Sequence, residues 1–318
     1  MSVPIPALRF RQLVSNIPHY LHELGSLRRP RDFYSWAAYK QPYLFRFQEF
    51  PLRLTFEPTN ECNFACPHCP RTVINSNRGI GFLELELFCK IIEEASPHRP
   101  LVKLGGLGEP ALHPDLGVMM ETLRERRLET ILYTNGTLFE RYTTSEILKW
   151  NLPLLIVSVD GTDERSFERL RVGGKYEVLR KNLATFRRAR EHALVPRPEI
   201  EIRHVTMPGE TAEQLAEFRR DWLHELGDTV RFNYLLPPLE RHRLEDPSRP
   251  RCRDIARELY IRFDGRVPLC GYHGEWLGDL HQSTVDELWH HPRLTDVRRQ
   301  HEKRDLSQLP FCRTCAFR

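Results

Sequence analysis

Three cysteines within one eight-residue stretch are the side chains of this chain best suited to chemistry. Cys62, Cys66 and Cys69 have the spacing C-x3-C-x2-C. A structural zinc site is usually closed by four ligands, typically in two C-x2-C pairs, whereas a [4Fe–4S] cluster normally takes four thiolates. Three thiols in one tight loop therefore predict a cluster with one iron open to another ligand. Buried thiols that gather by chance are the alternative.

Four further cysteines gather in the last quarter of the chain and form a second candidate metal site. Their spacing is C-x17-C-x41-C-x2-C, and the residues are Cys252, Cys270, Cys312 and Cys315. Four thiolates are enough to close one [4Fe–4S] cluster. A zinc site made by the same four cysteines is the alternative.

Two more residues are weaker candidates for catalysis. Cys89 shares a helical face with Leu85, Phe88 and Ile92, which predicts a thiol buried in the core. A hydrogen-atom donor is the alternative role for it. His273, in the tail, is a candidate proton acceptor, with a plain loop histidine as the alternative.

The elements that must position these residues alternate between strands and helices. Hydrophobic periodicity predicts six βα units in series, which favour a parallel sheet with right-handed crossovers. Such a sheet carries its chemistry at the carboxyl ends of the strands. The predicted strands are Leu52–Phe56, Leu101–Leu104, Thr130–Thr134, Leu154–Val159, Ile200–Val205 and Val230–Tyr234. The predicted helices are Gly81–Ala95, Leu116–Arg126, Thr144–Trp150, Leu179–His192 and Ala212–Leu226.

Glycine-rich and polar motifs follow the ends of three predicted strands. Gly105-Gly106-Leu107-Gly108-Glu109-Pro110 follows the second strand. Its glycines allow the backbone to approach a ligand closely, and Glu109 can pair with an ammonium group. The third strand ends in Tyr133-Thr134-Asn135-Gly136, and the fourth in Ser158-Val159-Asp160-Gly161.

The cysteine loop, with Thr59-Asn60 before it and Pro70-Arg71 after it, resembles the cluster loop of radical S-adenosylmethionine (SAM) enzymes. The resemblance covers roughly residues 52–236. It implies that the open iron binds the amino and carboxylate groups of SAM. An electron from the cluster then cleaves SAM to methionine and a 5′-deoxyadenosyl radical, which abstracts a hydrogen atom from the substrate.

The resemblance also implies roles for single residues around SAM. His68 holds the position that lies near the adenine, and Arg171 matches an arginine that faces SAM. The glycine motif resembles the Gly-Gly-Glu motif that contacts the methionine amine, with a departure at Leu107. The residues implied as cofactor contacts are His68, Gly106, Gly108, Glu109, Asn135, Ser158, Asp160 and Arg171. The alternatives are a solvent-facing loop histidine for His68, a turn or helix cap for Asp160 and a surface salt bridge for Arg171.

The tail resembles the SPASM or twitch extension of radical SAM enzymes, which holds an auxiliary iron–sulfur cluster. Its Leu259–Val267 stretch predicts a hairpin with an Asp-Gly turn. We therefore expect an α/β protein with a partial (β/α)6 TIM-like barrel and a small C-terminal iron–sulfur domain. The expected parts are an aromatic and basic arm at 1–50, the radical SAM core at 51–238 and the auxiliary-cluster domain at 239–318.

Composition limits the class of protein. The 318 residues are 40% hydrophobic and 28% charged, which is ordinary for a soluble globular protein. A net charge of +4 is too small to indicate nucleic-acid binding. Eight cysteines in a long chain without a signal peptide at its start predict a cytoplasmic metalloprotein. The arm is expected to pack against the core, with a membrane-surface helix or a docking segment as alternatives.

The resemblance, with one fully ligated auxiliary cluster in a short chain, implies a radical SAM oxidoreductase that dehydrogenates a sugar, an aminocyclitol or a similar small hydroxylated molecule. A flavodoxin or ferredoxin is the expected electron donor. A radical sugar epimerase and a peptide-modifying enzyme are alternatives, although residues 1–50 look too short for a dedicated leader-binding domain. A non-enzymatic zinc-binding adaptor is the alternative from another class.

Overall fold

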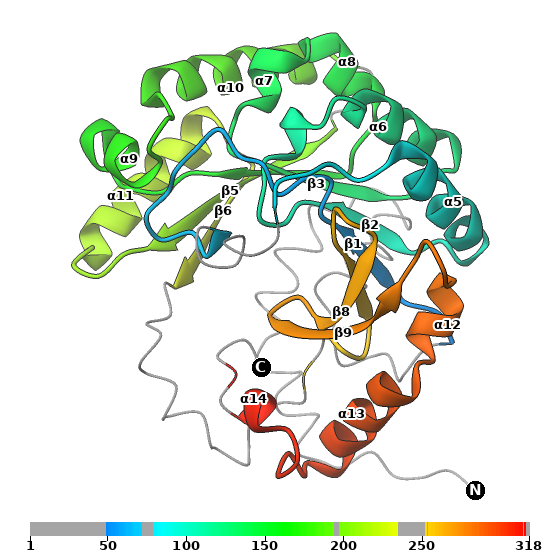
Figure 1. Cartoon of the computed structure of the whole chain (residues 1–318). Helices are drawn as coiled ribbons and strands as arrows, with labels where there is room; N and C mark the ends of the chain where they lie inside the picture. Colours follow the sequence, from blue (N-terminus) through cyan, green and yellow to red (C-terminus); the bar gives the residue numbers. More distant parts are fainter. Residues whose placement is uncertain are drawn as a thin grey trace, which may run out of the picture. The chain divides into compact units, whose positions relative to one another are not determined.

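The computed structural model describes residues 49–71, 79–193, 197–234, 252, 254–313 and 315 (Figure 1). The expected arm at 1–50 lies outside the described residues, apart from its last two positions. Most of the expected boundary between core and tail, at residues 235–250, also lies outside them, as does the side chain of His273.

The core is a parallel sheet whose strands follow one another in chain order. The six strands lie side by side in the order β6-β5-β4-β3-β2-β1, and every neighbouring pair is parallel. This confirms the expected half barrel, and each predicted strand matches within one residue at either end. The strands are β1 (Arg53–Phe56), β2 (Leu101–Leu104), β3 (Thr130–Thr134), β4 (Leu154–Ser158), β5 (Glu199–Thr206) and β6 (Thr229–Tyr234).

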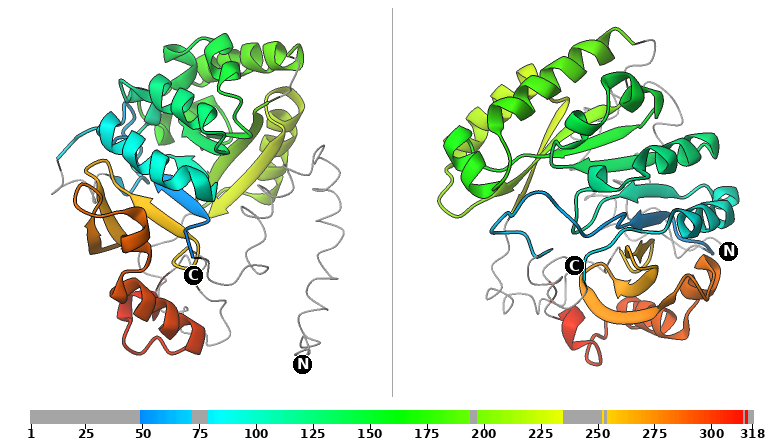
Figure 2. Two further views of the ribbon diagram at one scale, coloured as in Figure 1. Left: turned by 90° about the vertical axis from the view of Figure 1, so that its right-hand side faces the viewer. Right: turned by 45° about the horizontal axis from the view of Figure 1, so that its top comes forward.

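Helices cover one face of this sheet, as the two further views show (Figure 2). All five predicted helices are present, and two further short helices, α7 and α9, were not predicted. Single-turn 3₁₀ helices occur at Ser96–His98 and Pro110–Leu112. The helices of the core are α5 (Leu85–Ala95), α6 (Leu116–Glu125), α7 (Leu138–Arg141), α8 (Thr144–Lys149), α9 (Glu164–Leu170), α10 (Tyr176–Glu191) and α11 (Ala212–Glu225).

Helix α5 begins at Leu85, four residues later than predicted. The segment before it is held in an extended form, because Phe82 forms a bridge with Thr59 and the Gly81 N–H donates to the Asn60 side chain. These contacts tie the start of the helical segment to the cysteine loop. The buried face of α5 also differs from the expected one: Leu87, Phe88, Ile91 and Ile92 are buried, whereas Leu85 and Cys89 are only half-buried.

Alternation along the strands separates two faces of the sheet. Leu54 and Phe56, with their counterparts on the neighbouring strands, are buried against the helices in the hydrophobic core. The residues between them lie on the opposite face, which we call the inner face. Its side chains are largely polar and charged, and they include Arg53, Thr55, Lys103, Tyr133, Ser158, Glu201, Arg203 and Arg231.

The tail adds a seventh strand to the core sheet. Strand β7 (Glu258–Ile261) pairs in parallel with β1, while β8 (Arg266–Cys270) pairs antiparallel with β9 (His273–Asp279). The predicted hairpin is therefore wrong in its pairing, although its turn is present. The Arg262 N–H donates to Arg266 O at 3.0 Å, and Gly265 has the positive φ of +74° that favours glycine. Strand β7 joins β1 instead because the edge of β1 offers a ladder that also buries Leu259 and Ile261 in the core.

Three helices complete the tail, and side chains of the core secure it. Glu94 accepts hydrogen bonds from the first N–H groups of α12, and Lys90 donates to Leu280 O at 2.9 Å. In the described parts of the chain, no helix is both long enough and apolar enough to cross a membrane. The helices are α12 (Val285–Trp289), α13 (Pro292–Lys303) and α14 (Pro310–Arg313).

Candidate functional site

The cysteine loop follows β1 and is held by its own backbone and by a neighbouring turn. Cys69 N donates to Cys66 O at 3.1 Å, and Ala65 N donates to Val172 O at 2.8 Å, in the turn after α9. Cys66 is buried and Cys62 is half-buried. Burial raises the pKa of the Cys62 and Cys66 thiols. Thiolates at these positions therefore need a positive charge beside them, which fits ligation by iron.

The glycine motif after β2 packs directly against this loop. A Cβ atom on Gly108 would lie 2.2 Å from Thr59 O and 2.5 Å from Glu61 O, so only glycine fits there. Glu109 N also donates to Glu61 O at 2.8 Å. Close backbone approach therefore joins the motif to the residue that precedes the first cysteine.

The Glu109 carboxyl is buried at the tip of the sheet and accepts three hydrogen bonds. The donors are Asn135 N at 2.6 Å, Thr134 Oγ1 at 2.9 Å and Ala111 N at 3.1 Å. Burial nevertheless raises the pKa of Glu109 to about 7, and no Lys or Arg of the described ranges forms an ion pair with it. A buried carboxyl in this state fits a cationic ligand group, such as the ammonium of SAM.

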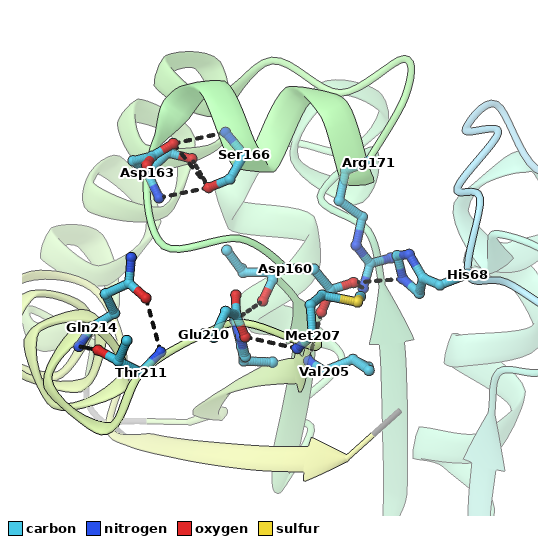
Figure 3. Close-up of polar contacts among 12 residues, drawn as sticks. His68, Asp160, Asp163, Ser166, Arg171, Val205, Met207, Glu210, Thr211 and Gln214 are labelled. Carbon is cyan, nitrogen blue, oxygen red and sulfur yellow. Dashed lines mark hydrogen bonds and ion pairs between the residues drawn. The ribbon is translucent and has the colours of Figure 1, made fainter. Parts of the chain in front are cut away.

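His68, Asp160 and Arg171 come from three separate segments and meet in one buried cluster (Figure 3). Asp160 Oδ2 accepts from His68 Nε2 at 2.9 Å and from Arg171 Nη2 at 2.6 Å, and Oδ1 accepts from Val205 N at 2.7 Å. Burial alone would raise the pKa of Asp160, but the Arg171 charge and the His68 hydrogen bond hold it below its usual value. Asp160 therefore orients two side chains that lie beside the cysteines.

The same cluster bears on two of the alternatives left open by the sequence, the helix cap for Asp160 and the surface salt bridge for Arg171. The cap of α9 is Asp163, whose side chain accepts from Ser166 N at 2.7 Å, so Asp160 is not a helix cap (Figure 3). The ion pair of Arg171 is buried, not a surface salt bridge. His68 Nδ1 and Arg171 Nε are buried and have no hydrogen-bond partner in the described structure.

The third and fourth strand tips border the same site. Asn135 Nδ2 donates to Asn63 Oδ1 at 3.0 Å and lies 3.8 Å from Cys62 Sγ. Ser158, half-buried at the end of β4, stands beside Arg203 in the sheet register. Sequence reasoning did not single out Asn63 or Thr134, although both lie within motifs that it quoted.

A buried ion pair connects the core to the tail and was also missed. Arg262 Nη1 donates to Glu57 Oε2 at 2.8 Å, and Nη2 donates to Gly271 O at 2.9 Å. Gly106 packs on the same glutamate, since a Cβ there would lie 3.0 Å from Glu57 Cγ. Each charged residue directly follows a strand, β1 or β7, and that position was the only sequence signal for the pair.

The tail cysteines lie in three separate segments, and Cys270 directly precedes the Gly271 of this connection. Cys252, Cys270 and Cys312 are half-buried against the hydrophobic core, and Cys315 N donates to Cys312 O at 3.4 Å. Burial raises the pKa of Cys252 to about 12. Within the described ranges, no three His, Cys, Asp or Glu side chains are close enough to hold a single metal ion. A [4Fe–4S] cube distributes its thiolates over four irons and does not require that tight a set.

Cys89, the weaker catalytic candidate, is separate from both cysteine groups. It lies on α5, half-buried and packed against the hydrophobic core. This helix belongs to the layer on the other side of the sheet from the inner face.

Comparison with known proteins assigns both parts of the chain. The family model of the radical SAM superfamily matches residues 56–221, and that of SPASM, an iron–sulfur cluster-binding domain, matches residues 252–316. A cofactor-modifying protein of tungsten-containing aldehyde ferredoxin oxidoreductase from Pyrococcus furiosus is 26% identical over 58% of this chain and 51% of its own length. A probable GTP 3′,8-cyclase from Methanococcus maripaludis is 26% identical over 61% of this chain and 62% of its own. The chain thus spans between half and two thirds of these relatives.

Solved structures share the fold at low sequence identity. Streptococcus suis SuiB bound to S-adenosylmethionine is 16% identical with a TM-score of 0.61, over 79% of this chain and 68% of its own. BtrN in complex with AdoMet and 2-DOIA is 16% identical with a TM-score of 0.53, over 83% of this chain and 92% of its own. The two domains imply SAM, the [4Fe–4S] cluster that binds it and an auxiliary [4Fe–4S] cluster as cofactors. The chain belongs to the radical SAM superfamily and carries a C-terminal SPASM domain.

Proposed function

We propose that this enzyme dehydrogenates a hydroxylated carbon of a small molecule such as a sugar or an aminocyclitol. When bound, SAM and the two clusters supply the cleaving electron, the radical that takes a hydrogen atom and an acceptor for the substrate's electron. A flavodoxin or ferredoxin is the proposed source of the first electron. Loss of a hydrogen atom from carbon, and of a proton and an electron from the resulting radical, leaves a carbonyl group.

The residues of the chain bind and orient under this proposal. Cys62, Cys66 and Cys69 hold the cluster that binds SAM, and the Glu109 carboxylate receives the SAM ammonium. Asp160 keeps His68 and Arg171 at the face where the rest of SAM lies. The four tail cysteines hold the auxiliary cluster, and we retain His273 as the proposed proton acceptor.

The observation that carries the dehydrogenation proposal is the bridge made by Arg262. Its guanidinium binds the Glu57 carboxylate and the carbonyl of Gly271. Glu57 packs on Gly106 of the glycine motif that we propose contacts SAM, and Gly271 follows Cys270. A fixed connection between the glycine motif and the segment that carries Cys270 favours oxidation, because oxidation needs an electron acceptor held close to the substrate.

Epimerisation requires a hydrogen-atom donor instead of an electron acceptor. The spare thiol for that role is Cys89, and it lies on α5, in the helix layer behind the sheet. A donor there cannot reach the inner face without crossing the sheet. This position supports dehydrogenation over epimerisation.

Peptide modification is a second candidate, and the comparisons are the reason to keep it. The subtilosin biosynthesis protein AlbA from Bacillus subtilis is 25% identical over 48% of this chain and 33% of its own length. SuiB bound to its precursor peptide SuiA shares the fold with a TM-score of 0.61, over 91% of this chain and 79% of its own, at 15% identity.

The test begins with the anaerobically reconstituted and reduced protein. SAM cleavage to 5′-deoxyadenosine is expected, and it should accelerate with the true substrate in a panel of sugars, aminocyclitols and short peptides. In deuterated water, dehydrogenation yields a carbonyl and no solvent deuterium at the reacting carbon. Deuterium at an inverted carbon would establish epimerisation, and a product made only from peptides would establish the second candidate. Stoichiometric zinc without iron in the tail would contradict the auxiliary-cluster assignment.

A further inference from the structure

Two arginines extend the SAM site across the inner face of the sheet. In the register of β4, β5 and β6, Ser158 is the neighbour of Arg203, and Arg203 is the neighbour of Arg231. Neighbouring residues of parallel strands point to the same face. The three side chains therefore form one row that runs from the proposed SAM contact at β4 to the edge strand β6.

One buried carboxylate holds both arginines. Glu201 Oε1 accepts from Arg203 Nε at 3.0 Å, and Oε2 accepts from Arg231 Nε at 3.2 Å. Arg203 also donates from Nη1 to the Tyr133 hydroxyl at 2.8 Å, and its guanidinium lies 5.0 Å from the centre of that ring. Arg203 is thus fixed between a carboxylate and an aromatic ring.

Arg231 differs from Arg203 in what its outer nitrogens contact within the described part of the chain. The side chain is 40% exposed, whereas that of Glu201 is only 2% exposed. Neither Nη1 nor Nη2 of Arg231 makes a hydrogen bond to any residue that the structure describes. Both oxygens of Glu201 are already engaged, so this carboxylate has no further oxygen to offer the Arg231 fork.

Two other cations of the inner face, by comparison, are paired with a buried carboxylate. Lys103 donates to Glu258 Oε1 at 3.3 Å, and Arg53 also pairs with the side chain of Glu258, which is fully buried. These groups lie on the β7 side of the sheet. Among these inner-face cations, an anionic ligand group finds open donors at Arg231.

We propose that Arg231, held by Glu201 and flanked by Arg203, is the subsite for an anionic group of the substrate, a carboxylate or a phosphate. A guanidinium fork binds either group with two parallel charge-assisted hydrogen bonds. The inference rests on the proposed function, since it places the substrate beside SAM. The substrate then spans the inner face, with its anionic end at β5–β6 and its reacting carbon towards β4.

The test measures anion binding by thermal unfolding of the full chain with both clusters and SAM bound. Inorganic phosphate and acetate are titrated separately at constant ionic strength, with sodium chloride as the balancing salt. A ligand that binds only the folded state raises the melting temperature as it saturates. The wild type is expected to show a saturable rise with at least one of the two anions. A rise with phosphate alone indicates a phosphorylated substrate, and a rise with acetate indicates a carboxylate.

Three variants isolate the arginine. Arg231→Gln is expected to weaken the binding of that anion about tenfold, the effect of losing a charge-assisted hydrogen bond. Arg231→Lys keeps the charge without the fork and should fall between Arg231→Gln and the wild type. Arg219→Gln is the matched control, because Arg219 is exposed and lies over Phe232, on the opposite face of the same strand. It should match the wild type.

Three results would overturn the subsite. These are no saturable rise with either anion, unchanged binding in Arg231→Gln, and equal losses in Arg231→Gln and Arg219→Gln. Failure of the proposed function is separate and visible in the same preparations. A wild type that cleaves SAM but binds neither anion loses only the subsite. A wild type that binds the anion through Arg231 but never cleaves SAM loses only the proposed function.

Discussion

The two cysteine regions of this molecule are built in opposite ways. Cys62, Cys66 and Cys69 lie in one loop after β1, and hydrogen bonds within that loop and to the turn after α9 fix its shape. The tail cysteines stand on three separate segments between Cys252 and Cys315. The first region is therefore largely local in sequence, whereas the second exists only once the tail has folded onto the core.

The two regions also differ in how buried charge holds them. Near the first loop, the Asp160 carboxylate is paired with Arg171 as its counter-ion. Glu109, in contrast, is buried with a raised pKa and has no paired cation among the described residues. In the tail, Arg262 pairs with Glu57 of the core and donates to the carbonyl of Gly271, which follows Cys270. The comparison teaches that the first region is complete except for its ligand, whereas the second depends on the contact with the core.

The largest expected effect comes from removing the first cysteine set. Replacing Cys62, Cys66 and Cys69 together by Ala should halve the iron content from about eight to about four per chain, since each cube holds four irons. Formation of 5′-deoxyadenosine should fall below detection, while the tail keeps its cluster. Iron and sulfide analysis with product chromatography checks this. Loss of all iron would show that the two regions do not load independently.

The next-largest effect tests the role of Asp160 in holding Arg171 and His68. Asp160→Asn leaves the buried Arg171 without its counter-ion, which costs about 3 kcal/mol in the free energy of unfolding. SAM affinity should fall as well, because His68 and Arg171 lose their orientation. Denaturant unfolding and equilibrium dialysis measure the two quantities. Asp163→Asn is the matched control on the exposed cap of α9, where Asn caps as well as Asp. Equal effects of the two changes would contradict the anchoring role.

The pH dependence of SAM binding tests whether Glu109 is the partner of the SAM ammonium group. Glu109 has a pKa raised to about 7, and only its ionised form attracts an ammonium group. SAM affinity should therefore rise with pH up to about 7 and drop about tenfold per unit below it. The free energy of unfolding of the SAM-free protein should change in the opposite direction and decrease as the pH rises. The contribution of a raised carboxyl is fully present below its unfolded pKa and is lost as the pH rises through about 7.

Glu109→Gln provides the control for this profile, since it removes the titrating group. SAM affinity in this variant should be low and independent of pH between roughly 5.5 and 8, a range that brackets the pKa of about 7. Calorimetric titration at several pH values measures it. A wild-type affinity that is flat over the same range would exclude Glu109 as the ammonium partner.

The smallest expected effect sharpens the dependence of the tail on the core. Arg262→Met removes the hydrogen bonds to Glu57 and Gly271, which together contribute about one to two kcal/mol. The variant should therefore release auxiliary-cluster iron to a chelator several-fold faster than the wild type. The SAM cluster should release its iron at the wild-type rate. Arg266→Met, four residues further on, is the control, because Arg266 is more exposed and both of its side-chain contacts, the ion pair with Asp264 and the position over the Trp276 ring, lie within the tail. Equal release rates in the two variants would remove Arg262 from the connection.

Sequence alone determined the parts of this protein whose signals are local. The cysteine spacing predicted the cluster loop, hydrophobic periodicity predicted the six βα units, and the polar motifs followed the correct strands. Parallel strands bring their carboxyl ends to one edge, so the site residues could be expected together before any contact was known. Short-range periodicity and topology were sufficient for that inference.

The tertiary structure alone decided the contacts between distant segments. Strand β7 left its expected hairpin for the edge of β1, because an open edge and a buried apolar face outweigh a two-residue turn signal. Asp160 became an anchor for His68 and Arg171. Because Glu201 is shared with Arg203, Arg231 keeps outer donors that no described residue engages. Each outcome depends on burial and on which charges meet across the sheet. Sequence spacing does not encode these quantities, because they arise only when separate elements pack together.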